Sequence, residues 1–235
     1  DIAFFLDEHE LERMVRRRKP ARIFVGDMLD IFHTNVPSEY LMRLFATGAE
    51  CPQHTILLLT KRAERMKHEV WNYVRQQQQP FPSNIWLGVS AENQHNADER
   101  IPHLLQTPGS VAVRWVSIEP MLGPVDLSRH RQGLKWVVVG GESGPHARPM
   151  HPDWVRSLRD QCIAENVSFY LKQWGEWAPD CLCETKQPHR TTPRPKPGKV
   201  GVLFHCGRKN AGDELDGEQW HQIPDREHIC QQTHA

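Results

Sequence analysis

The sequence predicts an α/β fold, a partial or closed (β/α) barrel of parallel strands with a C-terminal loop and hairpin appendage. Six short apolar runs alternate with longer amphipathic segments, which is the pattern of strands and helices in turn. The runs are continuously apolar rather than alternating with polar residues, as is typical of parallel strands covered on both faces. An open, doubly wound sheet is the alternative arrangement of the same elements.

Length and composition favour one main domain with an appendage. A chain of 235 residues with 38% apolar residues can bury a sizeable core. We therefore expect a barrel-like domain, similar to a TIM barrel, over residues 1–177 and an appendage over 178–235. Because the chain opens on Asp1 rather than a methionine, we also expect it to be a fragment or a processed product.

Charge and cysteine usage limit the partners and the compartment. Lys+Arg and Asp+Glu both number 29, so no overall field draws the chain toward nucleic acid or anionic lipid, and only a local patch could do so. No apolar run approaches the ~20 residues that span a bilayer. The six cysteines are scattered rather than spaced as a disulfide framework. We expect a cytoplasmic protein without a membrane partner.

The elements are predicted in order along the chain. The chain enters through a helix that ends in the basic run 16–19. Pro37 suits a first helical position, Thr60 suits the cap of a helix over 61–78, and Pro152 opens another helix. The stretch from Glu119 to Leu134 carries no helix pattern. Strands are expected over 22–27, 55–60, 85–90, 111–117, 135–141 and 167–172.

The alternation stops after Trp177. The following stretch is rich in proline, and we expect residues 180–199 to be among the least ordered of the chain. Beyond it, Asp216 and Gly217 stand between polar flanks and predict a small β-hairpin.

Polar residues follow every predicted strand. In parallel α/β folds the carboxyl ends of the strands carry the functional groups, because the loops there converge. Helix capping explains a hydroxyl group at any single strand end, but it does not explain the charged residues beside the hydroxyl groups. We therefore expect a site built from Asp27, Asp30, Lys61, Arg62, Ser90, Glu92, Ser117, Glu119, Gly140, Gly141, Glu142, Ser143, Lys172, Gln173 and Trp174.

The segment Gly140-Gly141-Glu142-Ser143 is the most suggestive of these strand ends. Two glycines let a backbone approach a ligand closely and offer amide N–H groups to a carboxylate or phosphate. Glu142 could accept a hydrogen bond from an amine or a ribose hydroxyl. The segment thus suits an adenosyl or amino-acid ligand, and a tight turn with a solvated Glu142 is the equal alternative.

Several motifs together resemble a known family. They are "RRKPARIFVGDMLDIFH", "HTILLLTKRAERM", "IWLGVSAENQHNADERIPHLL", "RWVSIEPMLGPVDL", "WVVVGGESGPHARPMHPDWVRSLRDQC" and "FYLKQWGEW". In this order they resemble the phage-derived Gp thirty-seven/Gp sixty-eight proteins, a family of unknown function. The resemblance implies a relative of the radical S-adenosylmethionine enzymes, with a partial (β/α) barrel. Members usually begin with a three-cysteine motif ending in Cys-Tyr-Ala, which in radical enzymes would hold a [4Fe-4S] cluster.

That cysteine motif does not occur in this sequence, so we expect a cluster only if a segment upstream of Asp1 supplies it. The resemblance divides the strand-end residues by role. Candidates for catalysis are Glu119, Glu142 and Lys172. A pocket for S-adenosylmethionine would use Ser90, Glu92, Ser117, Gly140, Gly141, Glu142 and Ser143. Substrate contacts would come from Asp27, Asp30, Lys61, Arg62, Gln173 and Trp174.

Two alternatives stay open. The chain could instead be a cluster-free barrel that binds a nucleotide-like or nucleic-acid ligand without catalysis, with the basic run 16–19 touching phosphates. We expect no metal site within the chain, and the alternative is a zinc site at Cys181, Cys183 and Cys206, with His205 beside them.

Overall fold

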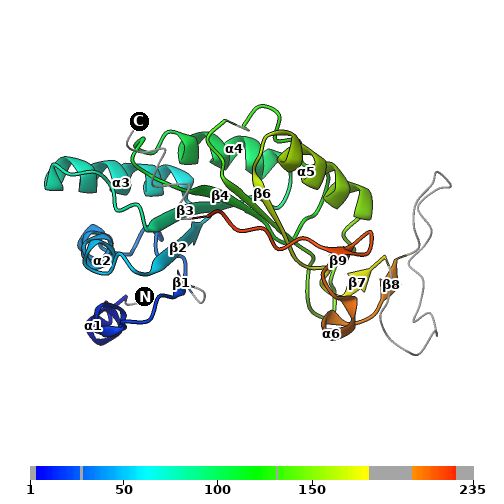
Figure 1. Ribbon diagram of the computed structural model, residues 1–235, viewed down its shortest axis with the longest axis horizontal. Helices are drawn as coiled ribbons and strands as arrows, with labels where there is room; N and C mark the ends of the chain where they lie inside the picture. Colours follow the sequence, from blue (N-terminus) through cyan, green and yellow to red (C-terminus); the bar gives the residue numbers. More distant parts are fainter. Residues whose placement is uncertain (1–3, 27–28, 131, 180–202, 226–235) are drawn as a thin grey trace. The chain divides into compact units, whose positions relative to one another are not determined.

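The computed structural model describes residues 4–26, 29–130, 132–179 and 203–225 (Figure 1). The helices are α1 (Glu8–Arg16), α2 (Ser38–Glu50), α3 (Ala63–Gln77), α4 (Gln94–Leu105), α5 (Pro152–Ala164) and α6 (Arg208–Ala211). The six main strands are β1 (Arg22–Val25), β2 (Thr55–Thr60), β3 (Ile85–Ser90), β4 (Arg114–Ile118), β5 (Trp136–Gly140) and β6 (Ser168–Gln173). Four two-residue strands follow, β7 (Trp177–Ala178), β8 (Phe204–His205), β9 (Glu214–Leu215) and β10 (Glu218–Gln219).

The six main strands form one sheet in sequence order, β1-β2-β3-β4-β5-β6. The pairs β1–β2, β2–β3 and β5–β6 are parallel. This consecutive order is that of a (β/α) barrel, whereas a doubly wound sheet reverses its order at a switch point. The order begins at β1 and ends at β6, so the sheet is open. The predicted α/β class and its partial-barrel form are therefore confirmed.

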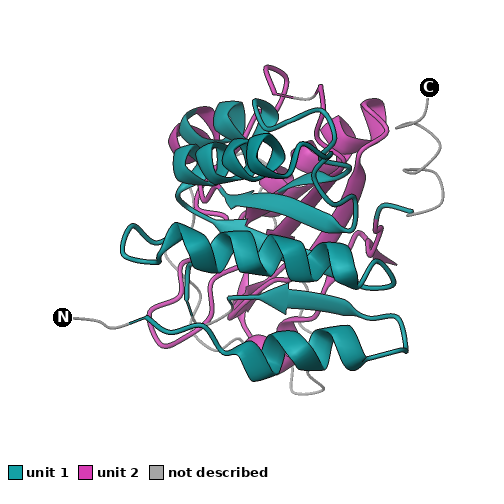
Figure 2. Cartoon of the chain, turned by 90° about the vertical axis from the view of Figure 1, so that its left-hand side faces the viewer, with its two compact units in different colours: residues 1–90, 99–115, 224–235 teal, residues 91–98, 116–223 magenta. Residues whose placement is uncertain are grey.

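The chain divides into two compact units, which Figure 2 distinguishes by colour. Unit 1 comprises residues 1–90, 99–115 and 224–235, and unit 2 comprises residues 91–98 and 116–223. The predicted boundary between residues 177 and 178 stays a prediction. Within the described residues, no helix has the length and apolar character needed to cross a bilayer.

An aromatic cluster forms the core of unit 1. Phe45 of α2 makes edge-on contacts with Tyr73 of α3 and with Phe81, at ring-centroid distances of 5.5 and 5.1 Å. Helix α2 packs against α1 on one side and α3 on the other. Such aromatic pairs bury large apolar areas with a preferred geometry, so they fix the helices of this unit beside β2.

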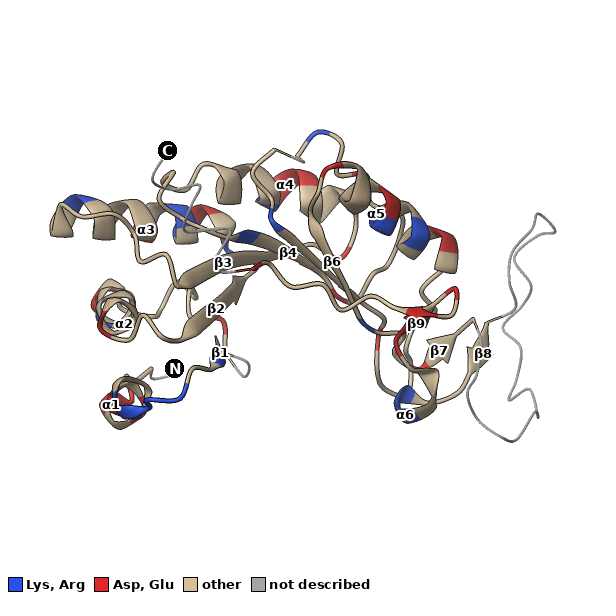
Figure 3. Cartoon of the chain, in the orientation of Figure 1, with Lys and Arg blue, Asp and Glu red and all other residues tan. Residues whose placement is uncertain are grey.

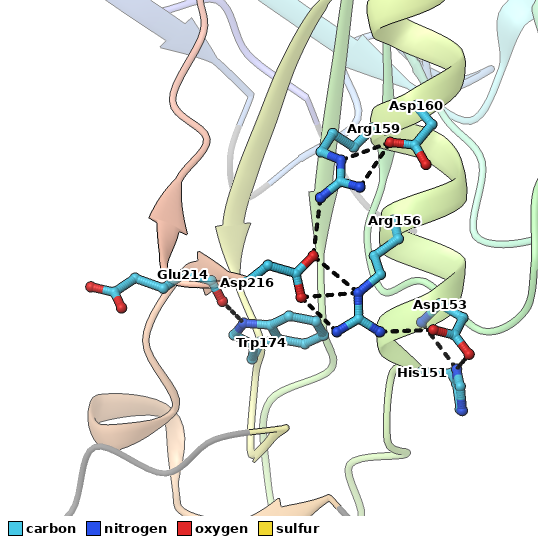
Figure 4. A network of polar contacts seen from close by, with 8 residues as sticks. All are labelled: His151, Asp153, Arg156, Arg159, Asp160, Trp174, Glu214 and Asp216. Carbon is cyan, nitrogen blue, oxygen red and sulfur yellow. Dashed lines mark hydrogen bonds and ion pairs between the residues drawn. The ribbon is translucent and has the colours of Figure 1, made fainter. Parts of the chain in front are cut away.

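Helix α5 and the edge of β6 hold the C-terminal hairpin in unit 2. Asp216 and Gly217 have φ angles of 58° and 82°, the left-handed conformation that a two-residue hairpin turn requires, so the predicted hairpin is confirmed. In Figure 4, the Asp216 carboxylate lies between Arg156 and Arg159 of α5 and accepts from both guanidinium groups. Further along, the Leu171 amide donates to the Trp220 carbonyl.

The strand and helix predictions differ from the structure mainly at their ends. The fourth strand begins at Arg114 rather than residue 111, because the Arg114 side chain binds the carbonyl oxygens of the preceding turn. Thr60 does not cap α3, because the cap residue is Arg62; the Thr60 hydroxyl accepts from the Arg62 amide instead. As predicted, no helix stands between β4 and β5 in the described residues. The proline-rich stretch 180–199 falls outside them.

Candidate functional site

The carboxyl ends of the strands carry the predicted polar residues. Thr60 and Ser90 are the last residues of β2 and β3, Ser117 is the last but one of β4, and Gly141 follows β5 directly. Asp27 lies outside the described residues. Because the two units are described separately, the strand-end residues form one group in unit 1 and another in unit 2.

A hollow of about 360 Å³ lies at the carboxyl ends of β1, β2 and β3 in unit 1. Its volume falls within the range of small-ligand sites, about 300–1,000 Å³. Four predicted site residues line it together, which are Asp30, Lys61, Arg62 and Ser90. Apolar side chains complete the lining, and two of them, Phe24 and Leu29, are 42% and 43% exposed.

Asp30 organises the polar side of this hollow. Its carboxylate accepts from the Thr60 hydroxyl at 2.8 Å, from the Arg62 guanidinium at 2.7 Å and from the Phe32 amide at 3.0 Å. A carboxylate has about four lone-pair sites, and these contacts use most of them. Asp30 therefore holds Thr60 and Arg62 in place, and only some of the five N–H donors of Arg62 are used in this pair.

The structure also explains how Ser90 and Glu92 are held. The Ser90 carbonyl accepts from the Arg100 guanidinium of α4 at 2.8 Å. Glu92 is buried, and its carboxylate accepts from the Asn96 amide at 2.7 Å. Both residues are thus tied to α4 just after β3. Ser90 faces the hollow, while Glu92 belongs to unit 2 and fixes the start of the helix.

Unit 2 brings four predicted residues together around one carboxylate. The Glu119 carboxylate, 18% exposed, accepts from the Ser117 hydroxyl at 2.9 Å and lies 3.3 Å from the ammonium of Lys172, which is 55% exposed. A methyl group at Gly140 would stand 2.4 Å from the Glu119 Oε1. Glycine at position 140 therefore leaves room for the Glu119 side chain, which occupies the space that a larger residue would fill.

Gly141 makes a different close approach. A methyl group there would stand 1.8 Å from the Trp174 carbonyl oxygen, which is backbone and cannot turn away. The Gly141 amide donates to the Gln173 carbonyl at 2.9 Å. This amide is thus already used inside the protein, and the glycine serves the approach of β5 and β6. Trp174 is a core side chain, 1% exposed, whose indole donates to the Glu214 carbonyl.

Glu142 is paired rather than open to solvent. Arg148 donates to its two carboxylate oxygens through Nε and Nη2 at 2.8 and 2.7 Å, and its own backbone amide donates as well at 2.8 Å. The side-chain hydrogen bonds, followed by the backbone one, lower the pKa of Glu142 to about 2. Ser143 stands beside this pair, with its hydroxyl 3.5 Å from the Gln173 amide oxygen.

The described cysteines do not gather. Cys51 and Cys162 are buried, and burial raises the pKa of Cys162 to about 12. The Cys206 thiol donates to the nearby Phe204 carbonyl. In the part of the chain that the structure describes, no three His, Cys, Asp or Glu side chains are placed to hold a metal ion. Cys181 and Cys183, of the alternative zinc site, lie outside that part.

Two functional candidates were missed from the sequence. Phe24 lines the hollow, and the charged Arg22 two residues before it was the signal, because alternate residues of a strand share a face and a charged residue marks the face that meets solvent. Arg148 pairs with Glu142 across an irregular loop of five residues, for which no periodicity exists.

Comparison with known proteins gives a family without an assigned activity. Neither a curated protein nor a solved structure matches the chain. A family model described as "Protein of unknown function (DUF5131)" matches residues 2–224, which is nearly the whole chain. The chain therefore belongs to this family of proteins of unknown function, DUF5131.

Proposed function

We propose that the chain binds a nucleoside with a charged tail, with S-adenosylmethionine as the first candidate, in the hollow at the carboxyl ends of β1, β2 and β3. The observation that carries the proposal is the lining of this hollow, which combines a half-exposed aromatic ring with cationic side chains. Its place at the carboxyl ends of parallel strands is where α/β folds bind such ligands.

Each part of the ligand has a partner of suitable chemistry. The ring of Phe24, next to Leu29, would stack against the adenine. The hydroxyl group of Ser90 stands on the same lining and would meet the ribose. Lys61 and Arg62 would bind the anionic end, which is a carboxylate in S-adenosylmethionine and a phosphate in a nucleotide.

A radical reaction is the finer part of the proposal, and it follows the resemblance to the phage-derived Gp thirty-seven/Gp sixty-eight proteins. The described residues fit the nucleoside but not a [4Fe-4S] cluster, because their cysteines are dispersed and two are buried. We therefore derive no step through a cluster. S-adenosylmethionine supplies an activated carbon beside its sulfonium, and the residues of this hollow bind and orient it.

Calorimetric titration tests the proposal with S-adenosylmethionine, adenosine and methionine as separate probes. We expect adenosine to bind and the charged tail to add affinity. Phe24→Ala should weaken the binding of adenosine by about 1–3 kcal/mol, the range for stacking of one base on an aromatic side chain. Lys61→Met should lower the affinity for S-adenosylmethionine while leaving the affinity for adenosine unchanged.

Lys67→Met on α3 is the matched control, because it removes the same charge from unit 1 outside the hollow. If the protein binds neither S-adenosylmethionine nor adenosine, the proposed function is refuted. Equal losses in Lys61→Met and Lys67→Met would show that the hollow does not bind the tail.

A further inference from the structure

A basic, exposed segment leads from the end of α1 into β1. Arg17, Arg18 and Lys19 follow α1, Arg22 begins β1, and all four are exposed. Figure 3 shows the corresponding concentration of Lys and Arg between α1 and β1. The formal net charge of the chain is +0, so this segment is a local feature rather than part of a general excess.

Within the described residues, no carboxylate neutralises the positive charge of this segment. On α1 itself Arg13 pairs with Glu10, and Arg16 pairs with Glu12. By contrast, Arg17, Arg18, Lys19 and Arg22 form no ion pair with any residue that the structure describes. Four cations close together in sequence repel one another, so an anion that lies along them is favoured.

The backbone of β1 aligns this segment with the hollow. Alternate residues of a strand face the same side, so Arg22 and Phe24 share a face, and both are exposed. Leu29 and Lys61, which are also exposed, line the hollow together with Phe24. Arg22 therefore shares a face with the aromatic ring of Phe24, and three further exposed cations precede it in the chain. We call these residues the basic strip (Arg17, Arg18, Lys19, Arg22 and Phe24).

We propose that the basic strip binds single-stranded nucleic acid, with phosphates on its four cations and one base on Phe24 at the edge of the hollow. Cations that follow a backbone, together with an aromatic ring that stacks a base, are how proteins hold single strands. A duplex would satisfy the cations but would offer no unstacked base to Phe24. The inference rests on the proposed function in one respect, since Phe24 also lines the nucleoside hollow.

The salt dependence of binding gives the number of phosphates involved. Neutralising four phosphates of a single strand, at about 0.7 each, predicts a slope of log K against log salt of about −2.8. The probe is a short fluorescein-labelled oligothymidylate, followed by fluorescence anisotropy over a range of salt concentrations. Arg18→Gln and Arg22→Gln should each reduce the slope by about 0.7. Arg75→Gln, an equal charge change on an exposed part of α3, should leave it unchanged.

Base stacking separates nucleic acid from any other polyanion. Phe24→Ala should lower the affinity for oligothymidylate by about 5- to 150-fold, which corresponds to the loss of one stacked base. It should leave the affinity for inorganic polyphosphate as it was. If polyphosphate and the duplex compete as well as the single strand, and Phe24→Ala changes nothing, the strip is a polyanion surface and the inference is wrong.

Adenosine titration distinguishes this inference from the proposed function. The double variant Arg18→Gln, Arg22→Gln should lose its binding of oligothymidylate but should still bind adenosine in the hollow. Binding of adenosine without any binding of oligothymidylate would overturn the strip alone. Oligothymidylate binding with the expected slope, in a protein that does not bind adenosine, would support the strip and refute the nucleoside hollow.

Discussion

The neighbouring glycines Gly140 and Gly141 should both lose stability when they are replaced by alanine, but for different reasons, since backbone lies against one and a side chain against the other. In Gly141→Ala the new methyl group would stand 1.8 Å from the Trp174 carbonyl oxygen and 2.5 Å from its carbonyl carbon. Both atoms are backbone, so β5 and β6 would have to separate. Overpacking typically costs about 1–3 kcal/mol, and we expect the upper end of that range or failure to fold.

Gly140→Ala meets only a side chain. Its methyl group would stand 2.4 Å from Oε1 and 3.0 Å from Cγ of Glu119, and that side chain can turn away. Turning away loses the Ser117 hydrogen bond to a charged group, worth about 1.5–3 kcal/mol, and the partly exposed Lys172 pair, worth about 0–1 kcal/mol. Replacing glycine by alanine stabilises the folded state by about 0.4–1 kcal/mol, because the unfolded chain has less conformational freedom. We expect a net loss of about 0.5–3.5 kcal/mol.

A double-mutant cycle with Glu119→Ala isolates this contact. Once Glu119 is shortened, the three atoms nearest the new methyl group are gone, so Gly140→Ala should become neutral or stabilising by about 0.4–1 kcal/mol. Gly141→Ala should remain damaging in the same background. Urea unfolding followed by tryptophan fluorescence and circular dichroism measures the four free energies. Additive effects of Gly140→Ala and Glu119→Ala, within about 0.5 kcal/mol, would refute the reasoning.

Three further predictions concern unit 2. The folded pKa of Glu142, about 2, lies below its usual 4.5, so its stabilisation is complete above about pH 4.5 and is lost as the pH falls toward 2; Glu142→Gln should flatten that part of the stability profile. Cys162, with its pKa near 12, should react with iodoacetamide at neutral pH only as fast as the protein opens, as peptide mass spectrometry would show. Asp216→Ala should lower the unfolding free energy by about 1 kcal/mol, because two arginines lose a partner, whereas Asp160→Ala should change it little.

The sheet could be predicted from the sequence because its signal is local. The central residues of runs such as "TILLLT" and "KWVVVGG" are continuously apolar, which is typical of strands covered on both faces. The order of the strands follows from the same rule, since consecutive parallel strands joined by helices usually lie side by side. Strand β1 lacks the continuous burial of the inner strands, because it lies at the edge of the sheet and leaves Arg22 and Phe24 exposed.

The roles of individual strand-end residues could not be predicted in the same way. The sequence grouped Trp174 with the site because it follows a strand. In the structure it is buried, and its indole N–H donates to the carbonyl of Glu214, forty residues later. Glu142 was expected to be open to a ligand, and Arg148 reaches it only because the intervening loop turns back. Contacts of this kind depend on the fold of irregular segments, which no periodicity describes.

Glycines at a strand end indicate a close approach, but they do not say what approaches. At Gly140 the approaching group is the Glu119 carboxylate, and at Gly141 it is the Trp174 backbone directly after β6. Both spaces are therefore filled by the protein itself. In unit 1 the space at the strand ends is a hollow of about 360 Å³, lined by Phe24 and Arg62. A ligand gains most where a hollow already exists and the lining is already ordered, which is why we assign the nucleoside to unit 1 and give Glu119 the role of ordering the end of β5.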